Sequence, residues 1–295
     1  MTEPLFDTLC VVGPGLIGSS VLRRLRAMPE LVGTLIVTDR DRDVLARARA
    51  LDLGDVVTDD LDAAVKDADC VMLCVPVGAI APIASRILPI MKSGAILTDV
   101  GSTRRSIVDA LTPHLRTDIA YVPAHPMAGT EHSGPDAGFA TLFEDRWCLI
   151  TPDRNAPEDA VTRIGAFWHA MGARTRRMDA DHHDTICAMV SHLPHLIAFT
   201  ICGTADTLAE DMRSEVLDFA ASGFRDFTRI AASDPTMWRD IFLNNRDALL
   251  GVLDRFSQDA AAMADAIRSG DEETIVETIE RGRRIRRSLL ENRQA

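Results

Sequence analysis

The first half of the chain alternates short, uninterrupted apolar runs with longer segments in which apolar residues recur at helical spacing. The apolar runs predict strands at residues 9–12, 34–38, 70–75, 95–100 and 119–122. The segments between them predict helices that include residues 16–28, 41–51 and 77–91. Continuous apolar strands separated by helices are typical of a parallel sheet covered on both faces. The pattern therefore predicts an α/β fold with a doubly wound sheet.

The pattern changes near residue 178. A last strand is predicted at 173–178, and beyond it helical periodicity dominates. The helical segments are 186–190, 197–208, 238–263 and 272–290. We therefore expect two domains, an α/β domain at 1–178 and an all-helical domain at 179–295. The length of 295 residues agrees with about two domains.

Composition and charge narrow the class of protein. The chain has 32 Lys plus Arg against 44 Asp plus Glu, a formal charge of −12, and 46% hydrophobic residues. These values are typical of a globular protein, and the acidic balance argues against nucleic-acid and anionic-membrane partners. The arginine cluster at 281–287 is interpreted as a solvated helix end.

The chain shows neither a membrane span nor a signal peptide by sequence criteria. Its longest uninterrupted apolar run falls short of the roughly 18 residues that a span needs. The first residues carry two acids and no basic stretch. The six cysteines form no CxxC pair, which predicts reduced thiols in a cytoplasmic protein.

A glycine-rich loop follows the first predicted strand and opens a helix. Its glycines, Gly13, Gly15 and Gly18, have the GxGxxG spacing that binds a dinucleotide pyrophosphate at a helix N-terminus. Asp39 stands 21 residues after Gly18, where a carboxylate binds the ribose hydroxyls of NAD and repels the 2′-phosphate of NADP. Arg40 is a residue type that binds such a phosphate, so NADP stays an alternative. The predicted cofactor contacts are Gly13, Gly15, Leu16, Ile17, Gly18, Asp39, Arg40, Val75 and Pro76.

Two polar segments follow predicted strands, on the edge of the sheet where doubly wound folds bind ligands. Ser102 comes after strand 95–100, and its alternative role is to cap the next helix. His125 comes directly after strand 119–122, and an imidazole there suits a general base. Glu131 either orients a histidine, binds a polar ligand group or is a surface acid.

The helical half contributes two further groups of candidates. His192 and His195 lie three residues apart and share one helix face. No cysteine or carboxylate stands at metal spacing, so no metal site is predicted. The acidic and histidine-containing segment 181–184 is interpreted as a helix start with acidic first-turn residues.

Two arginines, Arg225 and Arg229, lie in a segment otherwise rich in apolar and small residues. The planar guanidinium suits a substrate carboxylate. An internal ion pair with Asp226 or Asp234 is the alternative. Trp238, shortly after, is interpreted as a core residue.

Five segments, taken in order, resemble the prephenate/arogenate dehydrogenase family of tyrosine biosynthesis. They are residues 13–19, 99–102, 125–131, 191–195 and 223–229. The resemblance implies an N-terminal Rossmann domain, a helical domain that forms a homodimer, and NAD as cofactor. The chain departs from the family at Arg104, where the family often has lysine, and at Phe227, where it usually has threonine.

The resemblance also assigns roles to the site residues. It implies that His125 takes the proton of the substrate ring hydroxyl, that Ser102 hydrogen-bonds the same hydroxyl, and that Arg229 binds a substrate carboxylate. The other implied substrate contacts are His195, His192, Thr130, Glu131 and Asp226.

The predicted activity is NAD-dependent oxidative decarboxylation of prephenate to 4-hydroxyphenylpyruvate. Arogenate stays open as a second or sole substrate, and His132 is a candidate for favouring the keto acid. One alternative is another two-domain hydroxyacid dehydrogenase, but those enzymes use a lysine of the second domain, and Lys66 and Lys92 are the only lysines here. The other alternative is an inactive dinucleotide sensor.

Overall fold

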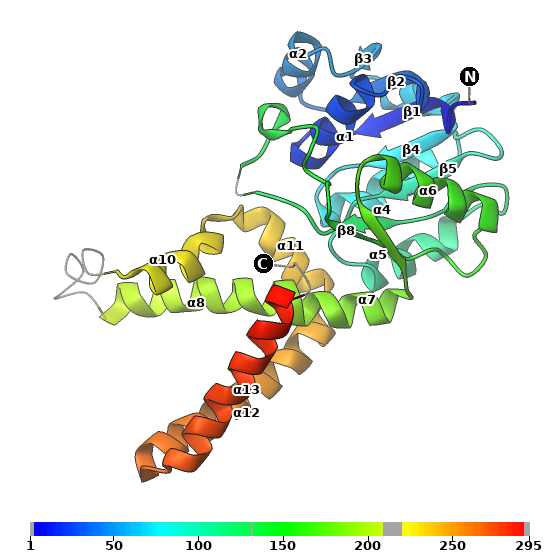
Figure 1. Ribbon diagram of the computed structural model, residues 1–295. Helices are drawn as coiled ribbons and strands as arrows, with labels where there is room; N and C mark the ends of the chain where they lie inside the picture. The colour runs from blue at the N-terminus through cyan, green and yellow to red at the C-terminus, as the bar shows by residue number, and fades with distance from the viewer. Residues whose placement is uncertain (1–2, 131, 209–219, 292–295) are drawn as a thin grey trace. The chain divides into compact units, whose positions relative to one another are not determined.

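The computed structural model describes residues 3–130, 132–208 and 220–291. Its N-terminal region is built on a sheet in the order β3-β2-β1-β4-β5-β6, in which every neighbouring pair is parallel (Figure 1). The strands are β1 Phe6–Val12, β2 Val32–Thr38, β3 Val56–Thr58, β4 Cys70–Leu73, β5 Ile96–Asp99 and β6 Ala120–Tyr121. This order reverses between β1 and β4 and is that of dinucleotide-binding Rossmann folds. The predicted doubly wound fold is confirmed.

Helices connect the strands, and the first three of them have Gly15, Asp41 and Asp60 as N-cap residues. The helices are α1 Leu16–Arg26, α2 Arg42–Ala50, α3 Leu61–Lys66, α4 Val77–Ile87, α5 Arg105–Leu111 and α6 Glu158–Ala170. The Asp41 carboxylate accepts the amides of Asp43 and Val44 at the start of α2, and Asp60 accepts the amide of Ala63 in α3. These carboxylates satisfy amides that the helix itself leaves unbonded.

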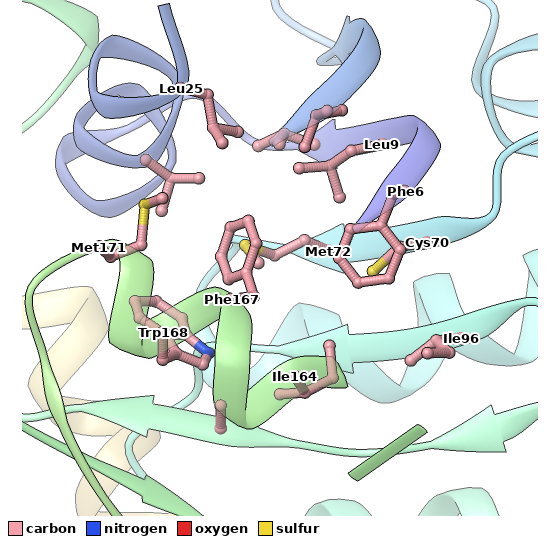
Figure 2. Packing of buried hydrophobic residues seen from close by; sticks show 14 of the residues in the cluster. Phe6, Leu9, Leu25, Cys70, Met72, Ile96, Ile164, Phe167, Trp168 and Met171 are labelled. Carbon is pink, nitrogen blue, oxygen red and sulfur yellow. The ribbon is translucent and has the colours of Figure 1, made fainter. Parts of the chain in front are cut away.

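Apolar side chains cover both faces of the sheet. On one face Phe167, Trp168 and Met171, from α6 and its end, lie with Phe6 of β1 and Met72 of β4 (Figure 2). The rings of Phe6 and Phe167 are 6.1 Å apart between centroids. The other face carries buried residues of α4 and α5, together with two residues of the later helix α11 (Pro235–Asn244). The core therefore extends from the sheet into the helical half of the chain.

A second, small sheet contains His125. Its strands are β7 Ala124–Pro126, β8 Trp147–Ile150 and β9 Arg174–Arg177, with β7 antiparallel and β9 parallel to β8. His125 follows the last strand of the main sheet, as the sequence indicates, but it lies in a strand of its own and pairs with Leu149 in this second sheet. Pro123 has no amide hydrogen to continue the ladder of β6, and the next three residues pair with β8 instead.

The helices after β9 form two groups, a continuous helical run and a later set of three shorter helices. The run consists of α7 Ala180–Cys187, a π-helical turn η3 Ala188–His192 and α8 Leu193–Leu208. Pro194, at the start of α8, lacks the amide that would bond the preceding turn, which explains the wider π-turn. The later set consists of α10 Ser222–Thr228, η4 Arg229–Ala232 and α11.

The helical run Ala180–Thr207 is, in the described part of the chain, the one segment long and apolar enough to cross a membrane by length and composition. Core helices of globular proteins meet the same criterion. Three of its polar residues, His183, Asp184 and His192, are buried inside the protein. One such helix, of whose apolar window 28% is buried here, is weak evidence for a membrane span.

The helix predicted at 238–263 is two helices in the structure. α11 ends at Asn244, Asn245 has non-helical backbone angles, and α12 Arg246–Ser269 begins after it. The side chain of Asn245 donates to the carbonyl of Asp184 and to Nδ1 of His192. These tertiary hydrogen bonds, which the apolar periodicity does not reveal, accompany the break.

Residues 247–295 form a compact unit of their own, separate from residues 1–246. It consists of α12 and α13 Glu272–Glu291, joined at Gly270 with a φ of 69°. Asp271 begins α13 by accepting the amide and hydroxyl of Thr274. Large apolar side chains are exposed along both helices, namely Leu250, Phe256, Ile267, Val276, Ile279, Ile285 and Leu289. This division at 246/247 does not coincide with the predicted boundary at 178/179 between an α/β domain and a helical domain, which stays a prediction.

Candidate active site

The glycine loop between β1 and α1 is shaped by close backbone contacts. Gly13 has a φ of 86°, and a Cβ on it would lie 2.6 Å from the carbonyl oxygen of Cys74. A Cβ on Gly18 would collide with the carbonyl oxygen of Gly13. Gly15 differs, because a Cβ there would meet no atom within 4 Å. The loop is therefore closed on the protein side and open at Gly15, where a pyrophosphate needs room.

The first turn of α1 also fits an anion. Gly15 is the N-cap and supplies no side-chain hydrogen bond to the amides that follow, which include those of Leu16 and Ile17. Free amides at a helix N-terminus bind phosphate groups. The residues of this loop thus fit a dinucleotide.

The other predicted cofactor residues lie at the same edge of the sheet. Asp39 and Arg40 follow β2, and Val75 and Pro76 follow β4, the two neighbours of β1. Oδ1 of Asp39 accepts the amide of Asp41 at 2.9 Å, which orients the carboxylate. Arg40 is exposed. Parallel strands bring all these positions to one carboxyl edge.

A buried ion pair lies beneath the loop that carries Ser102. The side chains of Asp99 and Arg104 are both 0% exposed, and Nη2 of Arg104 lies 2.8 Å from Oδ1 of Asp99. The same carboxylate accepts the amide of Gly101 and the hydroxyl of Tyr121, each at 2.8 Å. Burial opposes the charge of Arg104, but Asp99 and Asp184, with Tyr121, hold the pKa of Arg104 above its ordinary value. The position where the family often has lysine thus holds a fully buried cation.

Asp184 of α7 joins that loop to the helical half of the chain. Its Oδ1 accepts the amide of Arg104 and its Oδ2 the amide of Arg105, each at 2.8 Å. These are unbonded amides at the N-terminus of α5. Asp184 therefore caps α5 from a distant helix and fixes the loop that contains Ser102.

His125 lies in a buried cluster of imidazoles. Its Nδ1 is 2.9 Å from Nε2 of His183, and Nδ1 of His183 is 2.8 Å from Oδ1 of Asp184. Burial lowers the pKa of His125 well below 6.5, and its coulombic interactions with His183, Arg104 and His192 lower it further. Burial is also the main cause that lowers the pKa of His183 to about 2. Both rings are neutral at neutral pH.

The cluster fits a hydrogen bond better than a metal ion. His125, His183 and Cys187 place three possible ligand atoms within 4.8 Å of one another. Two nitrogen ligands of a tetrahedral zinc, each at about 2.0–2.1 Å, would lie about 3.3 Å apart. The 2.9 Å between the two rings is instead a hydrogen-bond distance. Burial raises the pKa of the Cys187 thiol to about 12, so it keeps its proton.

His192 and His195 lie on the next turns of the helical run. Asn245 donates to Nδ1 of His192 at 3.0 Å, and burial lowers the pKa of His192 to about 4. The ring of His195 stacks on Trp238 with centroids 3.7 Å apart, and its Nδ1 lies 2.9 Å from the carbonyl of Ser191. Burial lowers the pKa of His195, and the charge of Arg229 adds to this effect. Arg229 is therefore within electrostatic reach of His195.

Other predicted substrate contacts are not joined to this cluster. Ser102 is half-buried, whereas Thr130 and Asp226 are exposed. Within the described ranges none of these three hydrogen-bonds a histidine ring. Glu131 lies outside the described residues.

The sequence reasoning missed His183, Asp184 and Asn245. The segment 181–184 does start a helix, capped by Asp179, but its last two residues are buried rather than solvated. One feature of the sequence could have indicated that His183 is buried. His183 lies four residues before Cys187, an apolar residue type, so the two side chains share one helix face.

Two profiles of known protein families match this chain and together cover most of it. A family profile described as "Prephenate dehydrogenase, nucleotide-binding domain" matches residues 23–177, and one described as "Prephenate dehydrogenase, dimerization domain" matches residues 179–281. The chain belongs to the prephenate dehydrogenase family. The resemblance seen in the five sequence segments is confirmed, and the chain is an oxidoreductase of this family.

Relatives of this prephenate dehydrogenase family member match it over nearly its whole length. A cyclohexadienyl dehydrogenase of Zymomonas mobilis is 42% identical over 286 residues, 97% of each chain. A prephenate dehydrogenase of Bacillus subtilis is 33% identical over 85% of this chain and 67% of its own. The crystal structure of prephenate dehydrogenase from A. aeolicus with hydroxyphenyl propionate and NAD+ has a TM-score of 0.89 at 28% identity, covering 98% of this chain and 99% of its own.

The buried pair of Asp99 and Arg104 makes a first prediction. Asp99→Asn removes the carboxylate that compensates a fully buried guanidinium, so the free energy of unfolding should fall by about 3–5 kcal/mol. The measurement is urea unfolding followed by circular dichroism. Asp145→Asn is the matched control, since Asp145 pairs with Arg174 on the surface and its loss should change little. Equal midpoints for both variants would contradict a structural role for the buried pair.

Proposed function

We propose that this enzyme catalyses the NAD+-dependent oxidative decarboxylation of prephenate to 4-hydroxyphenylpyruvate, with arogenate as the alternative substrate to test. The observation that carries the proposal is His125, a buried imidazole whose pKa is lowered, so that it is neutral and able to accept a proton at physiological pH. The Zymomonas and Bacillus relatives, a cyclohexadienyl dehydrogenase and a prephenate dehydrogenase, and the NAD+ in the A. aeolicus structure support the same reaction.

The reaction needs few groups from the protein. Prephenate carries a carboxylate at C1 and a hydroxyl at C4. The hydroxyl proton goes to a base, hydride leaves C4, and carbon dioxide departs from C1 as the ring becomes aromatic. Bound NAD+ supplies the hydride acceptor. Because aromatisation drives the decarboxylation, the protein mainly positions the substrate and removes one proton.

The proposed roles follow from residue chemistry and family resemblance. His125 accepts the hydroxyl proton, Ser102 hydrogen-bonds the same hydroxyl, and Arg229 binds a carboxylate of the substrate. A guanidinium offers two parallel hydrogen bonds to a carboxylate. The remaining proposed substrate contacts are His192, His195, Thr130, Glu131 and Asp226.

The preference for NAD+ over NADP+ rests on Asp39. A carboxylate after β2 accepts hydrogen bonds from ribose hydroxyls and repels a 2′-phosphate. Arg40 beside it is the residue most able to weaken that preference.

We further propose a cytoplasmic homodimer formed through the helical domain at 179–295. The family's dimerization profile covers most of that domain, and exposed apolar side chains on α12 and α13 are typical of an interaction surface. All six cysteines are free thiols, as expected in a reducing compartment.

The direct test is the initial rate of cofactor reduction with four pairings, prephenate or arogenate with NAD+ or NADP+. We expect the highest rate with prephenate and NAD+. Reduction with arogenate alone would move the specificity to the other substrate. No reduction with any pairing by folded protein would contradict the proposed function.

Two variants separate proton removal from carboxylate binding. His125→Asn should lower kcat by about 10²–10⁴-fold and leave KM for prephenate nearly unchanged, because only the base is lost. Arg229→Ala should instead raise KM by roughly 10–100-fold, the effect of a lost charged hydrogen bond. His169→Asn and Arg154→Ala, at exposed positions, are the matched controls. Near-normal turnover by His125→Asn would show that another group is the base.

A further inference from the structure

His125 ends a chain of three buried side chains. His125 on β7 is 8% exposed, His183 on α7 is 0% exposed and Asp184 beside it is 4% exposed. The successive heavy-atom distances are 2.9 Å between the rings and 2.8 Å from ring to carboxylate. Water has little access to these atoms, so each must find its partner within the chain.

The direction of each hydrogen bond follows from Asp184. Its two oxygens already accept the backbone amides of Arg104 and Arg105, which are obligatory donors. Burial raises the pKa of Asp184, but these two amides and the charge of Arg104 oppose that effect and favour the carboxylate, which has no proton to give. Nδ1 of His183 must therefore be the protonated nitrogen that donates to Oδ1 of Asp184.

The direction of the hydrogen bond between His183 and His125 follows in the same way. His183 is neutral, so a proton on its Nδ1 leaves Nε2 as an acceptor. The nearest donor to that nitrogen is Nδ1 of His125, which must then carry the proton of the neutral His125 ring. Sγ of Cys187 lies farther away, 3.5 Å from Nε2 of His183 and 3.7 Å from Nδ1 of His125.

We propose that His183 and Asp184 are positioning residues for the base: together they hold the proton of His125 on Nδ1 and its lone pair on Nε2. This inference rests on the proposed role of His125 as the base. In the reaction the substrate O–H bond breaks and an Nε2–H bond forms on His125, while the O–H electron pair becomes part of the new carbonyl. The proton on Nδ1 stays in place throughout.

The chain also matters for the charge that forms. After proton transfer His125 is a buried cation, which burial and its coulombic interactions with His183, Arg104 and His192 disfavour. The Nδ1–H of that cation points at the lone pair of His183, and the carboxylate of Asp184 lies behind His183. A carboxylate that orients an imidazole and stabilises its cation acts in this way in serine proteases. Here a second imidazole stands between the two groups.

The tautomer is measured directly on the wild-type protein by 15N NMR of labelled histidine side chains at neutral pH. The signals are assigned by their loss in His125→Asn and His183→Gln. We expect His125 and His183 each to carry the proton on Nδ1 and to have an unprotonated Nε2. A proton on Nε2 of His125 would overturn the proposal. This result does not depend on whether the enzyme turns over prephenate.

Kinetics of three variants test the consequence. His183→Phe keeps a ring but offers no acceptor to His125, so kcat should fall by about 100-fold or more while KM and NAD+ affinity stay nearly unchanged. His183→Gln can present an amide oxygen near the position of Nε2, so its kcat should stay within about tenfold of wild type. Cys187→Ala, which removes the other neighbour of both nitrogens, should leave kcat nearly unchanged.

The outcomes separate the two proposals. Equal kcat values for wild type and His183→Phe would overturn the positioning role, as would an equal loss in His183→Gln and His183→Phe with normal NAD+ affinity. If His183→Phe does not fold, the NMR tautomer of wild-type His125 decides: a proton on Nδ1 supports the proposal, and a proton on Nε2 overturns it. An inactive wild type with the expected tautomer would contradict the proposed function and leave the hydrogen-bond chain standing.

Discussion

The carboxylate of Asp184 is the interaction on which the arrangement of the site depends. One side chain accepts the two amides at the start of α5 and the imidazole of His183. It therefore connects the loop of Ser102, the helical run that carries His192, and, through His183, the proposed base His125. A neutral side chain of the same size would satisfy fewer of these donors. These hydrogen bonds connect the Rossmann region to the helical run beside the proposed base.

Burial then sets the electrostatics of the site. Arg104 keeps its charge because Asp99 is buried with it, and the imidazoles around it stay neutral because added positive charge is disfavoured there. His125, the proposed base, is therefore kept neutral close to a permanent cation whose charge the buried carboxylate of Asp99 compensates.

The sequence predicted those features that local patterns encode. Apolar runs and the spacing of Gly13, Gly15 and Gly18 predicted the parallel sheet and its glycine loop, because strand burial and tight turns leave a local signature. His125 was singled out, but its place in β7 was not predicted, since a three-residue strand has no periodicity. His183 and Asn245 were missed because their burial comes from tertiary contacts between residues 53 to 61 positions apart. Local periodicity holds no information about such pairs.

The dependence of kcat/KM for prephenate on pH, at saturating NAD+, tests the central claim that the fold keeps His125 neutral. Protonated His125 cannot accept the hydroxyl proton, so activity is lost as pH falls through its pKa. Burial lowers that pKa most, and His183, Arg104 and His192 lower it further. We expect kcat/KM to hold from neutral pH to well below 6.5 before it declines. A decline that begins at or above pH 6.5 would show that His125 titrates as an ordinary exposed histidine and would contradict the account.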